Sequence, residues 1–222
     1  MATIISTLDT AITYLNTLYN ASSTAPTSGE EDYTVWTSLF NIAINLWESE
    51  SELWAELVQS LASAADGTKT TTAGTYSYAL PTLFKFPMSG YVWLGSNTNK
   101  TAYKVIKVQE KQLHENDTDR WCYFLNGYLY FNPNCTIPDA LTINYDFYKE
   151  ATKLTTGSDT FEMSDPMFAV YYALSELKKE EGDATALSIT NQKLEIMKDR
   201  NEMPAWFQSD NLLNNTEDGM GV

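Results

Sequence analysis

The spacing of apolar residues changes twice along the chain, and this limits the folds that it can adopt. Residues 4–19 carry apolar side chains at helical intervals, and a second helical pattern uses Trp36, Phe40 and Trp47. Through the middle of the chain the apolar residues alternate as in β-strands, and helical spacing returns after residue 165. An order of helices, strands and helices is typical of an α+β chain.

The N-terminal helices are expected within residues 1–67. Residues 21–32 form a loop by composition, because they include Pro26 and Gly29. The acidic stretch of residues 48–51 either separates a third helix from the second or lies within one long bent helix. This third helical pattern uses Leu53, Trp54, Leu57, Val58 and Leu61.

The middle of the chain, residues 68–157, is expected to be an antiparallel β-rich insertion. Strands are predicted at residues 68–80, 91–94, 102–108, 119–133 and 140–151. Within them, Asn126-Gly127 is the sequence signal of a type I′ hairpin turn. A two-residue loop at this position places Cys122 opposite Phe131 and away from Cys135, so we expect two free thiols.

A helical hairpin is predicted at residues 158–203. Asp165 is a good N-cap residue, Pro166 suits the first helical position, and Gly182 suits the end of a helix. The short turn that follows makes the two helices antiparallel neighbours. After it, the apolar residues lose their periodicity.

The predicted fold class is therefore α+β, with a helical bundle built from the N- and C-terminal helices. The hairpin of residues 158–203 packs on the helices of residues 1–67, and the β region is inserted between them. Residues 204–222 form an extended C-terminal tail.

The charge of the chain is unevenly distributed. The net charge is −15, and residues 1–68 contain nine acids and no Lys or Arg. Tight binding of nucleic acid needs clustered Lys and Arg, so we do not expect the chain to clamp DNA or RNA. No stretch has the length of a membrane helix, and the N-terminus lacks the basic start of a signal peptide, so we expect no membrane contact and synthesis in the cytosol.

Few residues offer catalytic chemistry. His114 is the only histidine and lies in a polar stretch, which is typical of a surface position, and Cys122 has no basic activator nearby in sequence. Residues 115–119 form either a solvated hairpin connection or a calcium-type loop. Among 29 acids, two carboxylates within reach of each other are expected by chance, so they are weak evidence for a glycosidase. We expect no enzyme activity, no metal and no cofactor.

The aromatic hairpin is the strongest candidate for a binding surface. Trp121 and Tyr123 share one face with Leu125, while Cys122 and Phe124 share the other, so both faces are apolar. Such a hairpin is either buried on both sides or pressed against another subunit. We predict a subunit interface that includes Trp121, Tyr123, Tyr128 and Tyr130; a sugar- or base-stacking platform is the alternative.

Three stretches of the sequence resemble head-to-tail adaptor proteins, also called connector or neck proteins, of tailed bacteriophages. They are residues 75–86 ("TYSYALPTLFKF"), residues 134–159 ("NCTIPDALTINYDFYKEATKLTTGSD") and residues 164–202, which contain the predicted helical hairpin. The likeness covers residues 75–203 and, more loosely, the N-terminal helices. The long N-terminal half and the near-absence of arginine depart from this family.

The resemblance implies a structural virion protein of the phage neck, assembled in the cytoplasm of the bacterial host. It implies a homo-oligomeric ring of about twelve copies, a dodecamer, that joins the portal protein to the tail or to a second neck protein and helps retain the genome. DNA would pass through this ring without specific binding. The tail would reach a neighbour or the portal, with aromatic and aliphatic anchors at Trp206, Phe207, Leu212 and Leu213.

Two alternatives remain from the sequence. The first is that the chain forms a tail-completion or tail-terminator ring, which has a role in phage assembly close to that of an adaptor. A carbohydrate-binding or carbohydrate-active protein would instead use the aromatic hairpin together with paired acids.

Overall fold

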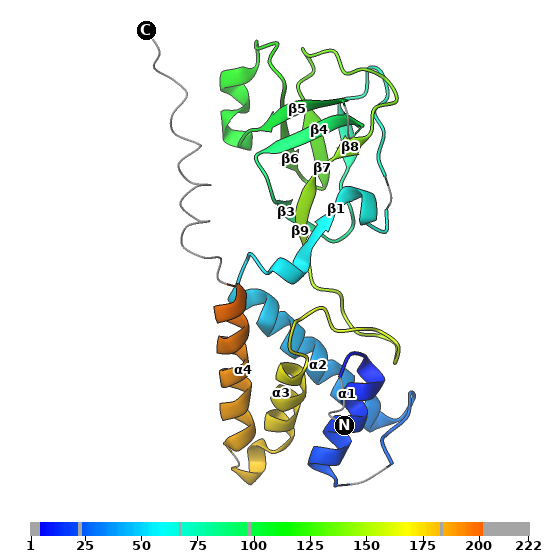
Figure 1. Cartoon of the computed structure of the whole chain (residues 1–222), viewed down its shortest axis with the longest axis vertical. Coiled ribbons are helices and arrows are strands. Elements are labelled where there is room, and N and C mark those ends of the chain that lie inside the picture. The colour runs from blue at the N-terminus through cyan, green and yellow to red at the C-terminus, as the bar shows by residue number, and fades with distance from the viewer. Residues whose placement is uncertain (1–4, 22–23, 67, 97–98, 183, 202–222) are drawn as a thin grey trace. The chain divides into compact units, whose positions relative to one another are not determined.

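The protein is described by a computed structural model that covers residues 5–21, 24–66, 68–96, 99–182 and 184–201. The chain divides into two compact units. The helical unit takes its described residues from Met1–Glu56 and Thr152–Val222, and the strand unit is Leu57–Ala151 (Figure 1). Both ends of the chain therefore contribute to one unit, and the middle of the chain forms the other.

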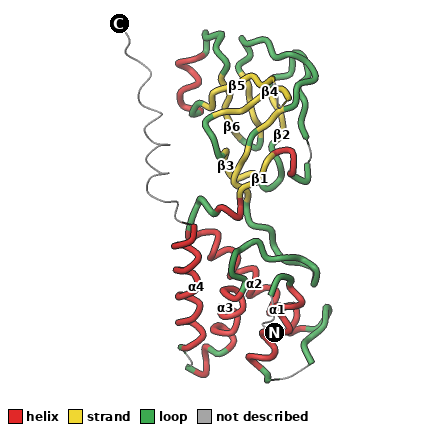
Figure 2. Tube along the Cα trace, in the orientation of Figure 1, coloured by secondary structure: helices red, strands yellow, loops and turns green. Residues whose placement is uncertain are grey.

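The helical unit is built on four α-helices among its described residues, shown in red in Figure 2. Each helix follows the apolar spacing of its sequence, which places one side in the core. Their bounds are α1 Leu8–Tyr19, α2 Glu31–Glu50, α3 Met167–Leu177 and α4 Thr185–Asn201.

The start of α1 is fixed by a distant part of the chain. Thr7 caps the helix, because its hydroxyl accepts a hydrogen bond from the Thr10 backbone N–H at 3.3 Å. The backbone N–H of Leu8 donates to the Asp159 carbonyl at 2.9 Å, and that of Asp9 donates to the Gly157 carbonyl at 3.0 Å. These bonds satisfy donors that a helix N-terminus otherwise leaves unpaired.

The predicted third N-terminal helix does not form. α2 ends at Glu50, and residues 55–63 form short 3-10 turns on either side of strand β1 (Val58–Ser60). β1 pairs in antiparallel fashion with β9 (Asp146–Lys149), and this ladder holds the backbone extended. Tertiary pairing has therefore overridden a helical sequence pattern.

The C-terminal helical hairpin forms close to where it was predicted. Pro166, not Asp165, occupies the cap position of α3, but the Asp165 carboxylate still accepts a hydrogen bond from the Met167 N–H at 3.1 Å. Gly182 has a φ of 71°, the left-handed conformation expected of a glycine that ends a helical segment.

In the strand unit, the described residues form two sheets. The smaller sheet has the order β1-β9-β3, with β3 at Phe84–Pro87. The larger, six-stranded sheet has the order β2-β7-β6-β5-β4-β8. Its strands are β2 Ser77–Ala79, β7 Tyr128–Phe131, β6 Trp121–Leu125, β5 Asn99–Val105, β4 Tyr91–Ser96 and β8 Ile143–Asn144.

The β6–β7 hairpin confirms the predicted turn and register. Asn126 and Gly127 have φ angles of 48° and 78°, as a type I′ turn requires. Leu125 pairs with Tyr128, and Cys122 pairs with Phe131. Both cysteines are free thiols, as expected.

The predicted architecture, a helical bundle with an inserted antiparallel β region, is wrong, although the chain is α+β. Among the described residues the strand-rich part is mainly a curled, mixed six-stranded sheet, and it has a hydrophobic core of its own. β5 and β6 run parallel, with Lys104 opposite Trp121. Parallel neighbours need a crossover, so residues 115–119 belong to a crossover segment and not to a hairpin connection. The crossover segment comprises residues 106–120, between β5 and β6, and contains the 3-10 helix η3 (Val108–His114).

The core of the strand unit lies on the inner side of the curled sheet. One residue, Tyr145, separates β8 in the larger sheet from β9 in the smaller sheet, so the predicted strand at residues 140–151 serves both. The fully buried members of this core include Val92, Leu94, Tyr103, Cys122, Leu129, Phe131, Ile143 and Phe147.

Candidate functional site

The four aromatic residues predicted as a subunit interface lie together on the outer face of the larger sheet, opposite the core. Their rings form a ladder across β6 and β7. The ring centroids of Tyr123 and Tyr130 are 5.0 Å apart and nearly parallel, at 10°. Trp121 lies 6.2 Å from Tyr123, and Tyr128 lies 6.1 Å from Tyr130.

The crossover segment covers the Trp121–Tyr123 end of this ladder. Trp121 and Tyr123 are buried and cluster with Ile106 and Val108, which precede or begin η3. The Lys111 ammonium lies 5.5 Å from the centre of the Tyr123 ring, a cation–π contact. Of the four predicted residues, Tyr128 alone is exposed, at 45%. The hairpin is thus apolar on both faces because its own chain covers both.

The structure shows a second aromatic pair at the other end of the same outer face. Tyr91 and Trp93 are 47% and 37% exposed, and their ring centroids are 6.0 Å apart. Strand alternation places both outward, since Val92 and Leu94 point into the core. A strand was predicted at residues 91–94, but its outward-facing residues were not among the predicted site residues.

Two exposed lysines accompany this aromatic pair on β5. Lys104 is opposite Tyr91, and Lys100 is opposite Gly95. A hollow of about 240 Å³ lies beside Trp93, and its lining includes Lys100 and Asn144. We call Tyr91, Trp93, Lys100 and Lys104 the β4–β5 patch.

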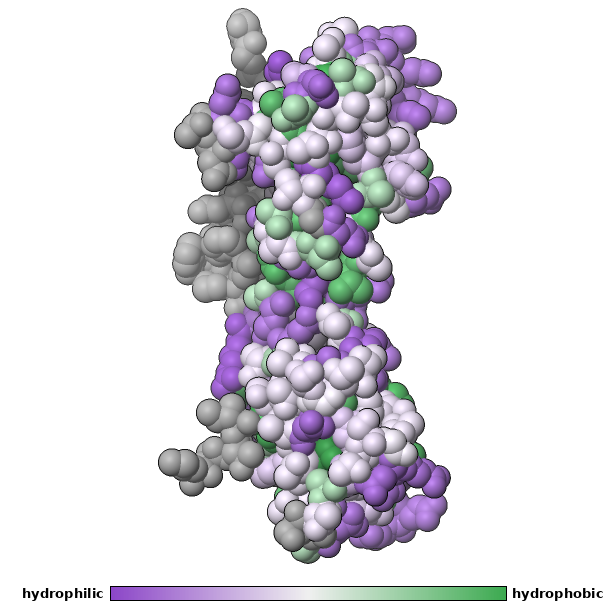
Figure 3. All heavy atoms as spheres, turned by 90° about the vertical axis from the view of Figure 1, so that its right-hand side faces the viewer, coloured by the Kyte–Doolittle hydropathy of each residue, from purple (hydrophilic) through white to green (hydrophobic). Residues whose placement is uncertain are grey.

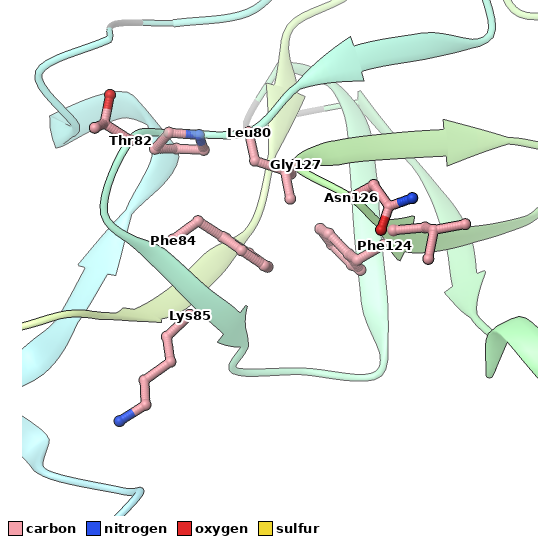
Figure 4. A pocket seen from close by; sticks show the side chains of 9 residues that line it. Leu80, Thr82, Phe84, Lys85, Phe124, Asn126 and Gly127 are labelled. Atoms are coloured by element: carbon pink, nitrogen blue, oxygen red, sulfur yellow. The ribbon is translucent and has the colours of Figure 1, made fainter. Parts of the chain in front are cut away.

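A larger hollow, of about 440 Å³, lies next to the hairpin turn. Its floor is apolar: the rings of Phe84 and Phe124 stack at 5.1 Å, and Leu80 lies above them (Figure 4). The Lys85 side chain points away from the hollow (Figure 4). This is an open apolar depression, not a walled catalytic cleft.

In the helical unit, α2 carries an apolar stripe on its outer side. Val35, Ile42 and Leu46 are 44%, 43% and 40% exposed, and Leu39 is half-buried between them. The spacing of four, three and four residues puts these side chains on one helix face. α2 itself has no charged residue between Asp32 and Glu48, and Lys153 donates a hydrogen bond to Asn45, which adjoins Leu46 in the helix. We call these four residues the α2 stripe.

Other exposed large hydrophobic residues include Leu53, Met88 and Leu113, which lie outside both the α2 stripe and the β4–β5 patch. Figure 3 shows one side of the molecule, on which polar and near-neutral residues predominate and hydrophobic areas are small and separate. Within the described part of the chain, no helix is both long enough and apolar enough to span a membrane.

The cysteines and the histidine considered as catalytic candidates are buried or bonded to neighbouring side chains within the fold. Burial raises the pKa of the Cys122 thiol, which keeps it protonated and unreactive. Burial, together with a contact between its hydroxyl and Cys135 Sγ at 3.8 Å, raises the pKa of Tyr103 to about 12. His114 Nδ1 lies 2.8 Å from an Asp117 carboxylate oxygen. In the described ranges, no three His, Cys, Asp or Glu side chains gather as metal ligands.

The four predicted portal-binding residues, Trp206, Phe207, Leu212 and Leu213, lie outside the described residues. So does the predicted extended tail, residues 204–222.

Comparison with known proteins does not add a family. No protein-family model matches the sequence, and a search of curated proteins finds no significant match.

Proposed function

We propose that the protein is a structural component of a phage virion neck, forming a homo-oligomeric ring that joins the portal to the tail. The observation that carries the proposal is the α2 stripe, an apolar helix face that one copy of the described chain leaves exposed. Contiguous exposed apolar surface of this kind is typical of protein–protein contacts. The resemblance of residues 75–203 to adaptor proteins supplies the class of assembly.

The helical unit also suits repeated side-by-side contacts. Each copy presents the α2 stripe on a helix whose opposite side is anchored in the core by Trp36, Phe40 and Trp47. A rigid helix face loses little conformational freedom when a neighbour covers it. A contact between two different surfaces of identical copies closes into a ring when the rotation between copies permits it.

The charge of the chain supports a role beside DNA without binding to it. Residues 1–68 carry acids but no Lys or Arg, and the total charge is −15. A channel lined by such a surface repels phosphate, so that DNA slides through instead of adhering. In a gel-shift assay we expect no tight DNA binding; salt-sensitive binding at nanomolar concentration would contradict this part of the proposal.

Charge introduced into the α2 stripe tests the ring. We expect the wild-type chain, alone or mixed with portal rings, to give ring-sized particles in mass photometry and negative-stain images. Ile42→Glu places a carboxylate in the proposed contact and should weaken assembly by more than about tenfold, because a charge buried at an interface without a partner is costly.

The matched control is Leu113→Glu, which adds the same charge to another exposed leucine, 79% accessible and outside the stripe. This variant should assemble like the wild type. A wild-type chain that stays monomeric with and without portal, or an Ile42→Glu variant that assembles normally, would contradict the proposal.

The carbohydrate alternative loses the surface on which it depended. A sugar-stacking platform needs accessible rings, and the crossover segment buries Trp121 and Tyr123. We therefore do not propose it as a second function.

A further inference from the structure

The β4–β5 patch lies on the side of the larger sheet that faces away from the core of the strand unit. Tyr91 and Trp93 point away from the core, and their neighbouring rings form a continuous aromatic area. The crossover segment covers Trp121 and Tyr123 in the middle of the same sheet face, but Tyr91 and Trp93 keep 47% and 37% of their surface exposed. Exposed aromatic side chains of this kind are enriched in binding sites.

The two lysines give this patch a positive charge. Strand alternation places Lys100 and Lys104 on the same outer face as the two rings, because Tyr103 between them points into the core. Among the described residues, neither lysine forms an ion pair. In a chain with a net charge of −15, this is a local positive site that fits an anionic partner.

The partner's chemistry follows from this combination. Two ammonium groups beside two rings fit an acidic peptide that also carries aromatic side chains. The hollow beside Trp93 is lined by Asp146 as well as Lys100, so the carboxylates of such a peptide are expected at the two lysines and not in the hollow. A nucleic acid is a poorer fit. Its affinity depends on neutralising many phosphates, and the patch offers two lysines in a strongly acidic chain.

The chain itself encodes a peptide of this chemistry at its C-terminus. Residues 202–222 contain Glu202, Asp210, Glu217 and Asp218, no Lys or Arg, and the aromatic pair Trp206-Phe207. The last described helix, α4, ends at Asn201, immediately before this stretch. Twenty-one residues span up to about 70 Å when fully extended, enough to reach a neighbouring molecule.

We propose that residues 202–222 of one copy bind the β4–β5 patch of a second copy. This inference rests on the proposed function, in that it requires copies to meet. The segment and the patch are different surfaces, so the contact is heterologous and can repeat around a ring. The lysines hold the carboxylates, and the rings of Tyr91 and Trp93 contact Trp206 and Phe207.

Photo-crosslinking in the full-length chain identifies what occupies the patch. Tyr91→p-benzoylphenylalanine keeps an aromatic group at the patch and crosslinks to whatever covers it. Mixing light- and heavy-isotope chains before irradiation separates crosslinks between copies from those within one copy. We expect crosslinked peptides from residues 202–222 that carry the opposite isotope label. Crosslinks to another segment, crosslinks only within one copy, or no protein crosslink in ring-sized particles would overturn the inference.

Charge reversal and a peptide assay separate this inference from the proposed function. In the crosslinking chain, the added pair Lys100→Glu and Lys104→Glu should lower the crosslink yield about tenfold, whereas Lys107→Glu, at another exposed lysine of the same unit, should leave it unchanged. If the chain forms no rings, the inference is tested by fluorescence anisotropy, which measures binding of a labelled peptide of residues 202–222 to the monomeric chain. Salt-sensitive binding to the monomer that the double reversal removes supports the inference, and no binding overturns it. If rings form normally but the crosslink is absent, the inference is wrong while the proposed function stands.

Discussion

The β6–β7 hairpin and α2 are both apolar on two sides, but they differ in how far the rest of the chain covers the second side. For the hairpin, one side lies in the core of the strand unit and the crossover segment covers most of the other. For α2, one side lies in the core of the helical unit, while Val35, Ile42 and Leu46 on the other side stay at least 40% exposed. The sequences of the two elements look equally suited to an interface. The difference is that one element has a neighbouring segment that covers it and the other has none among the described residues.

The comparison shows which kind of evidence identifies an interaction surface. Apolar composition predicts that a face is covered but does not say by what. The crossover exists because β5 and β6 are parallel, a pairing between residues far apart in the chain that local sequence patterns do not reveal. A candidate interaction surface is therefore the apolar surface that stays exposed after distant segments of the same chain have packed.

The largest expected effects come from core residues, and they test whether the two units are separately stabilised. Trp54→Ala removes a fully buried ring that stacks on Trp47 at 5.1 Å and donates to the Trp47 carbonyl at 2.7 Å. Phe147→Ala removes a fully buried ring from the core of the strand unit. Each should cost about 3–5 kcal/mol, and hydrogen exchange followed by mass spectrometry should locate each loss in its own unit.

Leu53→Ala is the control for the first of these variants. Leu53 is adjacent to Trp54 in the chain but is 55% exposed, so its truncation should cost less than about 1 kcal/mol. Equal loss of protection from hydrogen exchange in both units, from either core variant, would show that the units unfold as one and would contradict their separate stabilisation.

A backbone change in β4 has the next largest effect. Gly95 has a φ of 121°, and an added Cβ would lie 2.1 Å from the Asn99 carbonyl oxygen. We expect Gly95→Ala to lower the free energy of unfolding of the strand unit by about 1–3 kcal/mol, measured by urea denaturation. Gly90→Ala, just before the same strand, meets no atom within 4 Å and should stay within about 0.5 kcal/mol of the wild type.

A smaller effect is expected in the helical unit at Tyr33. Its hydroxyl donates to an Asp9 carboxylate oxygen at 2.9 Å, and burial together with this bond raises the pKa of Tyr33 to about 12. Tyr33→Phe leaves the carboxylate without this donor and should cost about 1–2 kcal/mol. In an absorbance titration the variant should lose one tyrosine that ionises near pH 12; loss of a tyrosine that ionises near pH 10, the ordinary value, would contradict the hydrogen bond.

The smallest effect is a pH dependence at Asp159. Its carboxylate accepts hydrogen bonds from the backbone and hydroxyl groups of Thr155 and Thr156, and these bonds lower its pKa. A lowered pKa in the folded state means that this contribution is present above the ordinary aspartate pKa, about 3.9, and is lost as the pH falls below it.

Thermal unfolding between pH 2 and 6 measures this dependence. Asp159→Asn should flatten the decline below about pH 4, because the amide cannot take up the proton. Asp199→Asn, at an exposed aspartate of α4 in the same unit, should leave the decline in place. An unchanged slope in Asp159→Asn would show that the threonine hydrogen bonds do not depend on its charge.

Local signals in the sequence predict local structure well. The Asn126-Gly127 turn fixed the register of β6 and β7, because a two-residue loop permits one pairing. The stripe from Met167 to Leu177 and Gly182 located the α3–α4 hairpin to within a residue or two. In both cases the determining interactions are close in sequence.

Non-local pairing accounts for what the sequence did not predict. Val58 belongs to a helical sequence pattern, yet pairing with the strand β9, far along the chain, holds it in an extended conformation. The β4–β5 patch was missed for a related reason. Tyr91 and Lys104 become neighbours through strand pairing, and only their outward alternation with Val92 and Tyr103 hinted at a shared face.

The contribution of both chain ends to the helical unit has a consequence for biosynthesis. α1 and α2 leave the ribosome first, but the residues that meet the start of α1, Gly157 and Asp159, follow only after the whole strand unit has been made. At translation rates of about 5–20 residues per second, the nascent helices wait for roughly 5–30 s with their core side uncovered. We therefore expect the apolar side chains of α1 and α2 to be prone to aggregation during that interval.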